Sequence, residues 1–172
     1  MGRLTAQKGA HYFIALAQAI LQKVPTALFV VAGSGDMYHE LLFHTADSRL
    51  TASVIFSGFI RDTQREKLLD RANVFVMPSL SEPFGLVALE AAQRHTPVLV
   101  SKTSGVGEVM PGSIAVDFWD VEKMSKLISE LLTNKPYSAA VVSSQLADTS
   151  KITWDTAAER LMGVYRSTFV PG

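Results

Sequence analysis

Hydrophobic and polar positions along the chain follow two periods that alternate from the start to beyond the midpoint. Apolar residues every three or four positions predict helices at 10–22, 37–46, 63–71 and 86–94. Short β-branched and aromatic runs predict strands at 27–32, 54–56, 74–77, 98–100 and 114–116. Helical spacing then returns at 121–132, 137–147 and 154–169. This order predicts a Rossmann-like α/β fold, with a parallel sheet, helices on both faces and further helices at the C-terminal end.

The segment from 78 to 92 carries the clearest chemical signal. It reads Pro-Ser-Leu-Ser-Glu-Pro-Phe-Gly-Leu-Val-Ala-Leu-Glu-Ala-Ala and joins a predicted strand to a predicted helix. Its turn-rich half leads into the start of the helix, where unpaired N–H groups and the helix dipole favour an anion such as a diphosphate. In parallel α/β sheets ligands bind beyond the carboxyl ends of the strands, which is where this loop falls.

Two carboxylates lie in this segment, Glu82 before the helix and Glu90 within it. Apolar residues surround Glu90 on every side, and such a helix is normally buried. A buried carboxylate needs a hydrogen-bond donor, either from the protein or from the hydroxyls of a ligand. From these residues alone a structural role stays open, with Glu82 favoured by the helix dipole and Glu90 bonded to a neighbouring loop.

Composition narrows the class of protein. The 172 residues are 48% hydrophobic, and sixteen basic residues balance sixteen acidic ones. The length fits one domain, and the zero net charge gives no general attraction for nucleic acid. There is no cysteine, no signal peptide and no apolar run of the roughly twenty residues that span a bilayer. We therefore expect a cytoplasmic domain without a transmembrane segment, with peripheral membrane attachment of a longer protein left open.

Five stretches, taken in order, resemble the group 1 (family 4) retaining glycosyltransferases, which are built from two Rossmann-like domains in the GT-B fold. Glu82 and Glu90 match that family's Glu-x7-Glu signature. The other stretches are Gly-Arg-Leu-Thr-Ala-Gln-Lys-Gly at 2–9, Val-Val-Ala-Gly-Ser-Gly at 30–35, Phe-Ser-Gly-Phe-Ile at 56–60 and Ser-Lys-Thr-Ser-Gly-Val-Gly-Glu-Val at 101–109. Each stretch alone is weak evidence, whereas the ordered set is specific. The resemblance implies that residues 1–172 form a single nucleotide-sugar donor-binding domain, the C-terminal one of the family.

The resemblance also implies a role for each matched residue. Arg3 and Lys8 would stabilise the leaving diphosphate, and Glu82 would bind sugar hydroxyls, so these three form the expected catalytic set. Glu90 would accept hydrogen bonds from the ribose. The other expected donor-binding residues are Gly33, Ser34, Gly35, Ile60, Phe84, Gly85 and Leu86. No metal or other cofactor is implied, and the four histidines lack the spacing of a metal site.

Simpler interpretations exist for most of these residues. As bare sequence, Arg3 and Lys8 would be solvated surface, residues 33–35 a structural turn, and Ile60 a packing residue. Glycoside hydrolysis by Glu82 and Glu90 is disfavoured. The two lie eight residues apart, across a loop and more than a turn of helix, so their carboxylates should lie farther apart in space than the two catalytic acids of a glycoside hydrolase.

The resemblance predicts transfer of a hexose from a nucleoside-diphosphate sugar to a saccharide or lipid acceptor. A non-catalytic nucleotide-sugar-binding or interaction module remains the alternative, and a nucleotide-sugar epimerase is a less favoured third. The family places an apolar strand and a whole acceptor-binding domain before the Gly-Arg-Leu loop, so both are expected to be absent here and the isolated chain to be inactive. A sheet without its first, central strand leaves backbone groups unpaired, which favours self-association.

Overall fold

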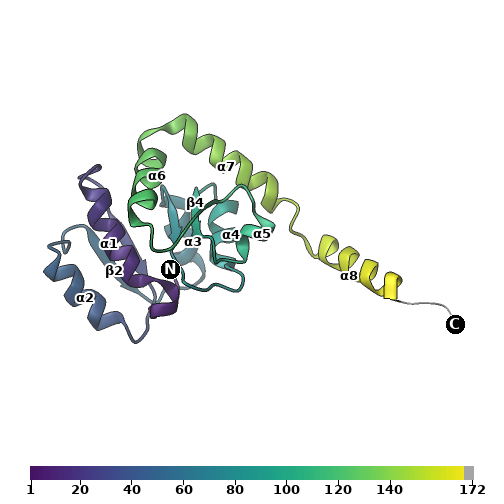
Figure 1. Cartoon of the computed structure of the whole chain (residues 1–172), viewed down its shortest axis with the longest axis horizontal. Coiled ribbons are helices and arrows are strands. Elements are labelled where there is room, and N and C mark those ends of the chain that lie inside the picture. The colour runs from purple at the N-terminus through teal and green to yellow at the C-terminus, as the bar shows by residue number, and fades with distance from the viewer. Residues whose placement is uncertain (169–172) are drawn as a thin grey trace.

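The structure, a computed structural model, describes residues 1–168 (Figure 1). Its strands are β1 (Phe29–Ala32), β2 (Val54–Gly58), β3 (Phe75–Met77), β4 (Val98–Ser101) and β5 (Ile114–Val116). Its helices are α1 (Ala10–Leu21), α2 (Tyr38–Asp47), α3 (Asp62–Arg71), α4 (Leu86–Gln93), α5 (Val106–Val109), α6 (Val121–Thr133), α7 (Lys135–Thr149) and α8 (Trp154–Thr168), with a 3-10 turn η1 at Ala6–Lys8. The predicted α/β class and order of elements are confirmed. Phe169, the last residue of the final predicted helix, lies outside the described residues.

All strand pairs are parallel, but the ladder hydrogen bonds divide the strands into two groups. β1 pairs with β2, and β3, β4 and β5 pair in that order. Within residues 1–168 no ladder joins β1 to β3, although Val31 of β1 and Val76 of β3 line the same cavity. The predicted parallel sheet is therefore present in two parts. Gly2 lines the same cavity, next to this division.

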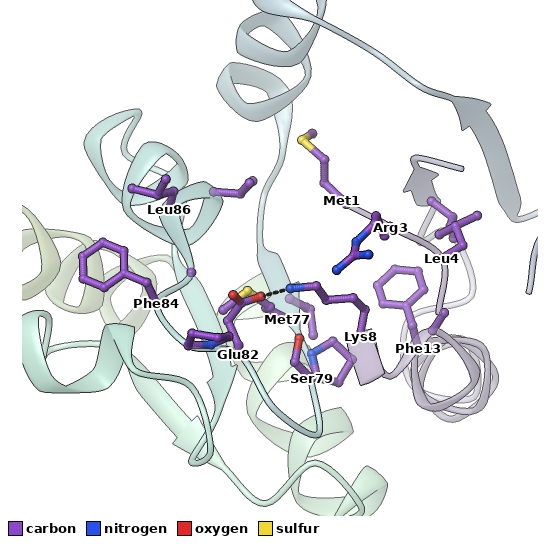
Figure 2. A pocket seen from close by; sticks show the side chains of 18 of the residues that line it. Met1, Arg3, Leu4, Lys8, Phe13, Met77, Ser79, Glu82, Phe84 and Leu86 are labelled. Carbon is purple, nitrogen blue, oxygen red and sulfur yellow. Dashed lines mark hydrogen bonds and ion pairs between the residues drawn. The ribbon is translucent and has the colours of Figure 1, made fainter. Parts of the chain in front are cut away.

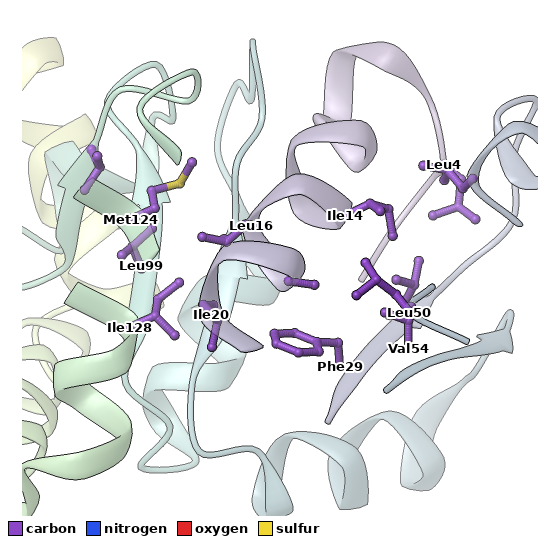
Figure 3. Packing of buried hydrophobic residues seen from close by; sticks show 14 residues of the cluster. Leu4, Ile14, Leu16, Ile20, Phe29, Leu50, Val54, Leu99, Met124 and Ile128 are labelled. Atoms are coloured by element: carbon purple, nitrogen blue, oxygen red, sulfur yellow. The ribbon is translucent and has the colours of Figure 1, made fainter. Parts of the chain in front are cut away.

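The side chains of β4 show how helices come to cover both faces of the sheet. Neighbouring residues of a strand point to opposite faces. Leu99 packs with Leu16 of α1 and Ile128 of α6 (Figure 3), whereas Val98 and Val100 pack in a second cluster with α4. The expected helices on both faces are confirmed.

The last helix stands apart from the rest of the fold. α8 extends away from the other elements in Figure 1, and none of its residues is buried. Trp154 at its start is 91% exposed. In the part of the chain that the structure describes, no helix has both the length and the apolar character needed to cross a bilayer.

Candidate functional site

The first residues of the chain run along the end of β1. The N–H of Gly2 donates to the carbonyl of Ala32 over 2.9 Å, and the N–H of Leu4 donates to the carbonyl of Ser34 over 2.9 Å. A Cβ atom at Gly33 would lie 1.7 Å from the Gly2 carbonyl oxygen, so no larger residue fits there. The need for glycine at this turn comes from the protein's own backbone.

The loop from 78 to 85 is fixed on two sides. The N–H of Leu80 donates to the carbonyl of Gln7 in η1, and the N–H of Gly105 donates to the carbonyl of Glu82, each over 2.9 Å. Glu82 also forms a single parallel bridge with Ser104, in the loop after β4. These bonds bring three of the loops expected from the sequence to the same edge of the sheet, and they hold Glu82 in place.

A cavity of about 450 Å³ opens between these loops (Figure 2). The Lys8 ammonium forms a hydrogen-bonded ion pair with Oε2 of Glu82, and the two side chains are 25% and 13% exposed. Arg3 faces the same cavity, and it has no ion pair with another described residue. Two cations against one carboxylate leave the wall of the cavity with a net positive charge.

The start of α4 forms the opposite wall of the cavity. Gly85 precedes the helix in the left-handed conformation, with φ of 100°, and Leu86 is the first helical residue. The N–H groups of a first helical turn have no partner within the helix and carry the positive end of its dipole. Phe84, Gly85 and Leu86 all line the cavity, so this terminus adds to its attraction for anions.

The amine of Met1 reports the charge of this region. Burial and then repulsion by Lys8 lower the pKa of the amine from 8.0 to about 6. Both causes act against a further positive charge. Only the repulsion depends on the sign of the charge, because burial disfavours an anion as well as a cation. The repulsion by Lys8 shows that its positive charge acts on this part of the cavity.

Glu90 lies outside this cavity. It borders a separate polar groove of about 530 Å³ between α3 and α4, where its Oε2 lies 3.3 Å from Nε of Arg65. The expectation that Glu90 is buried on every side is wrong, because its side chain is 34% exposed. The face of α4 that carries it turns toward the polar surface of α3 and is only partly covered. The expected hydrogen-bond donor is not found among residues 1–168, because Arg65 lies within ion-pair distance but Oε2 of Glu90 has no hydrogen bond. The sequence did not single out Arg65.

The expected site residues thus fall into two sets. Those that line the common cavity are Arg3, Lys8, Glu82, Phe84, Gly85 and Leu86. Those that do not line it are Gly33, Ser34, Gly35, Ile60 and Glu90. Ser79 also lines the cavity, and the sequence had assigned it only to a turn. Within residues 1–168 no three His, Cys, Asp or Glu side chains gather as metal ligands.

Parallel strands with helices on both faces define a Rossmann-like α/β domain. The cationic cavity lies beyond the carboxyl ends of the strands, which is where domains of this class bind their ligands. The chain belongs to the family of glycosyl transferases group 1, whose model matches residues 1–145. An uncharacterized glycosyltransferase of Methanocaldococcus jannaschii, MJ1607, is 36% identical over 182 residues, which cover 96% of this chain and 43% of that protein. The glycogen synthase of Mycobacterium tuberculosis is 33% identical over 171 residues, which cover 96% of this chain and 41% of that enzyme. The chain thus spans about two fifths of the length of these relatives.

Solved structures show the same fold. The C-terminal domain of a glycosyl transferase group 1 family protein (LpcC) from Francisella tularensis has 25% identity and a TM-score of 0.77, over 88% of this chain and 82% of that one. The Anabaena protein HepE, solved with UDP and glucose, has 21% identity and a TM-score of 0.81, over 98% of this chain and 48% of its own. The chain has the fold of a C-terminal domain of a group 1 glycosyltransferase.

Proposed function

We propose that residues 1–172 are the donor-binding domain of a cytoplasmic, retaining glycosyltransferase. The enzyme transfers a hexose from a nucleoside-diphosphate sugar to a saccharide or lipid acceptor. The observation that carries this proposal is the cavity in which Arg3, the Lys8–Glu82 ion pair and the start of α4 meet. Membership of the group 1 family supports the reaction class.

In this proposal Arg3 and Lys8 stabilise the leaving group. As the bond between the sugar and the phosphate breaks, its electron pair departs with the nucleoside diphosphate, and negative charge grows on the phosphate oxygens. Two cations that face a partly enclosed cavity stabilise that charge more strongly than water does. The proposal gives this task to the side chains and assigns no metal or other cofactor.

Glu82 and the start of α4 bind the rest of the reacting end. The carboxylate of Glu82 accepts hydrogen bonds from sugar hydroxyls, while Lys8 fixes its position. The N–H groups of Phe84, Gly85 and Leu86 donate to phosphate and sugar oxygens, as the first turn of a helix does for other anions.

Glu90 binds the nucleoside end of the same ligand. It follows Leu86 by four residues, so the two lie on one face of α4, about 6 Å apart along the helix axis. A nucleoside-diphosphate sugar is long enough to reach from the cavity to Glu90, where the ribose hydroxyls donate to the carboxylate. The proposal retains nucleotide contacts for Gly33, Ser34, Gly35 and Ile60, from the loops that follow β1 and β2.

The acceptor binds to residues outside this chain, and the isolated chain does not transfer sugar. We also propose that the chain self-associates through the inner edges of β1 and β3. Unpaired strand edges attract other chains, and the division between the two groups of strands supports this part of the proposal.

Calorimetric titration of the purified chain with UDP, GDP, ADP and their sugars tests the donor site. We expect selective binding of one nucleotide, weakened at least about tenfold in Lys8→Ala, because a charge-assisted contact to phosphate is lost. Glu90→Ala should weaken binding by a similar factor. Lys151→Ala is the matched control, since Lys151 is exposed and pairs only with Asp148 among the described residues.

A folded chain that binds none of these compounds would contradict the proposal. Binding that Lys8→Ala leaves unchanged would place the ligand elsewhere on the molecule. Binding without transfer, even when an acceptor-binding domain of a group 1 relative is supplied, would favour a non-catalytic nucleotide-sugar-binding module.

A further inference from the structure

The groove between α3 and α4 contains two arginines that pair with different carboxylates. Arg65 lies 3.3 Å from Glu90 through its Nε atom. Arg94 pairs with Glu66 at 3.1 Å and with Asp70 at 2.7 Å. Both arginines link α3 to α4, yet only Arg65 contacts a residue expected to bind ligand.

The contact between Arg65 and Glu90 has an unusual form. The Nε atom of Arg65 and the Oε2 atom of Glu90 are both enclosed, and neither has a hydrogen bond within residues 1–168. The guanidinium therefore lies within ion-pair distance of the carboxylate, with no hydrogen bond between Nε and Oε2. The pair fixes the position of Glu90 and leaves its hydrogen-bonding capacity unused.

The contact contributes little to the stability of the fold. The Arg65 and Glu90 side chains are 37% and 34% exposed, and ion pairs with this degree of exposure hardly change the free energy of unfolding. The effect of the contact that matters for function is therefore its effect on the position of the Glu90 carboxylate.

We infer that Arg65 is a positioning residue, which holds Glu90 in the orientation that accepts hydrogen bonds from the ribose hydroxyls of the donor. Arg65 fixes one carboxylate oxygen, Oε2, and Oε1 is the oxygen that accepts from the ligand. A carboxylate forms stronger hydrogen bonds with hydroxyl groups than a neutral acceptor does. Arg65 thereby sets the preference of the site for a ribonucleotide over a deoxyribonucleotide. This inference rests on the proposed function.

The test compares the affinities of UDP and 2′-deoxyUDP, with the guanine and adenine pairs titrated in parallel. A hydrogen bond to a charged group corresponds to roughly a 10- to 100-fold difference in affinity, so we expect the wild-type chain to prefer the ribonucleotide by that factor. Glu90→Ala should remove the preference. Arg65→Ala and Arg65→Met should reduce it to about threefold or less, while the melting temperature stays within about 2 °C of the wild type. Arg65→Met keeps an unbranched side chain and removes the guanidinium group with its charge.

Arg94→Ala is the matched control, because it removes an arginine from the same groove without touching Glu90. It should keep the full preference for the ribonucleotide. In the double variant that lacks both Arg65 and Glu90, the preference should be no lower than in Glu90→Ala alone, because Arg65 acts through Glu90.

The possible results distinguish a failure of the inference about Arg65 from a failure of the proposed function. If Glu90→Ala loses the preference and both Arg65 variants keep it, the inference is overturned and the proposed function stands. If the wild-type chain binds no nucleoside diphosphate, or if Glu90→Ala keeps the preference, the ribose contact itself is wrong and the inference falls with it. A loss of preference in Arg94→Ala equal to that in Arg65→Ala would also overturn it, since any disturbance of the groove would then have the same effect.

Discussion

Replacement of Ser79 by alanine should make the protein more stable, which is uncommon for a fully buried position. Ser79 is 0% exposed, and its Oγ atom has no hydrogen-bond partner among residues 1–168. Its backbone is well held, because the hydroxyl of Thr103 donates to the Ser79 carbonyl over 2.9 Å. The substitution therefore removes the unpaired hydroxyl and leaves the backbone contacts in place.

The expected magnitude follows from the cost of burying an unpaired polar group. A buried hydroxyl without a partner costs about 1–3 kcal/mol, and the loss of its packing contacts offsets a few tenths of that. We expect a net gain of about 1–2 kcal/mol in the free energy of unfolding. For a chain of this length each kcal/mol changes the melting temperature by about 2–4 °C, so the melting temperature should rise by about 2–8 °C. Thermal unfolding followed by circular dichroism measures this change.

Ser125 provides the matched control, since it is equally buried but fully bonded. It is 1% exposed, its hydroxyl donates to the carbonyl of Glu122 over 2.8 Å, and the ammonium of Lys23 donates to it over 3.1 Å. Ser125→Ala should lower the free energy of unfolding by about 1–2 kcal/mol, because two bonds are lost. A fall in stability for Ser79→Ala as large as that for Ser125→Ala would refute the reasoning, since it would mean that the Ser79 hydroxyl is paired.

Three further predictions concern other parts of the molecule. The pKa of the Met1 amine is about 6 in the folded chain and 8.0 in the unfolded one, so between those values the unfolded chain binds more protons. The free energy of unfolding should then rise between pH 6 and pH 8 by up to about 3 kcal/mol, and an N-acetylated chain should show no such rise. Gly33→Ala should cost at least about 3 kcal/mol in urea denaturation, because its Cβ would lie 1.7 Å from a backbone oxygen, whereas Gly58→Ala, with φ of 68° and no atom within 4 Å of the new Cβ, should cost about 1–2 kcal/mol. Light scattering should detect concentration-dependent dimers or larger species, and a strictly monomeric chain at high concentration would contradict self-association.

Local patterns in the sequence predicted the elements well. Helices of ten or more residues and strands with β-branched runs were placed to within two residues, because their periodicity is strong. The two shortest helical pieces, η1 and α5, were missed. They contain three and four residues, which is too few for a helical period to appear.

The meeting of the loops could also be predicted, because parallel strands bring their carboxyl ends to one edge. Arg3, Lys8 and Glu82 do meet there. Their roles toward a ligand remain predictions.

Contacts between helices could not be read from the sequence. The apolar surroundings of Glu90 predicted burial, yet burial depends on what packs against α4, and α3 presents a polar face. The proximity of Arg65 to Glu90 depends on the same packing of α3 against α4, which the local pattern of neither helix predicts. The burial of Ser79 was likewise hidden, because a serine in a turn-rich loop is usually exposed.

The division between β1 and β3 has a consequence for how the domain responds to ligand. Arg3 is tied to the end of β1 through the bonds of Gly2 and Leu4, whereas Glu82 and the start of α4 follow β3. Within residues 1–168 no ladder holds these two groups of strands together, so local unfolding should begin along the line between them. A ligand that contacts both sides at once closes that line, and at a hundred times its dissociation constant it adds about 2.7 kcal/mol to the stability of the whole domain. Ligand binding and the resistance of the domain to local unfolding are therefore thermodynamically linked.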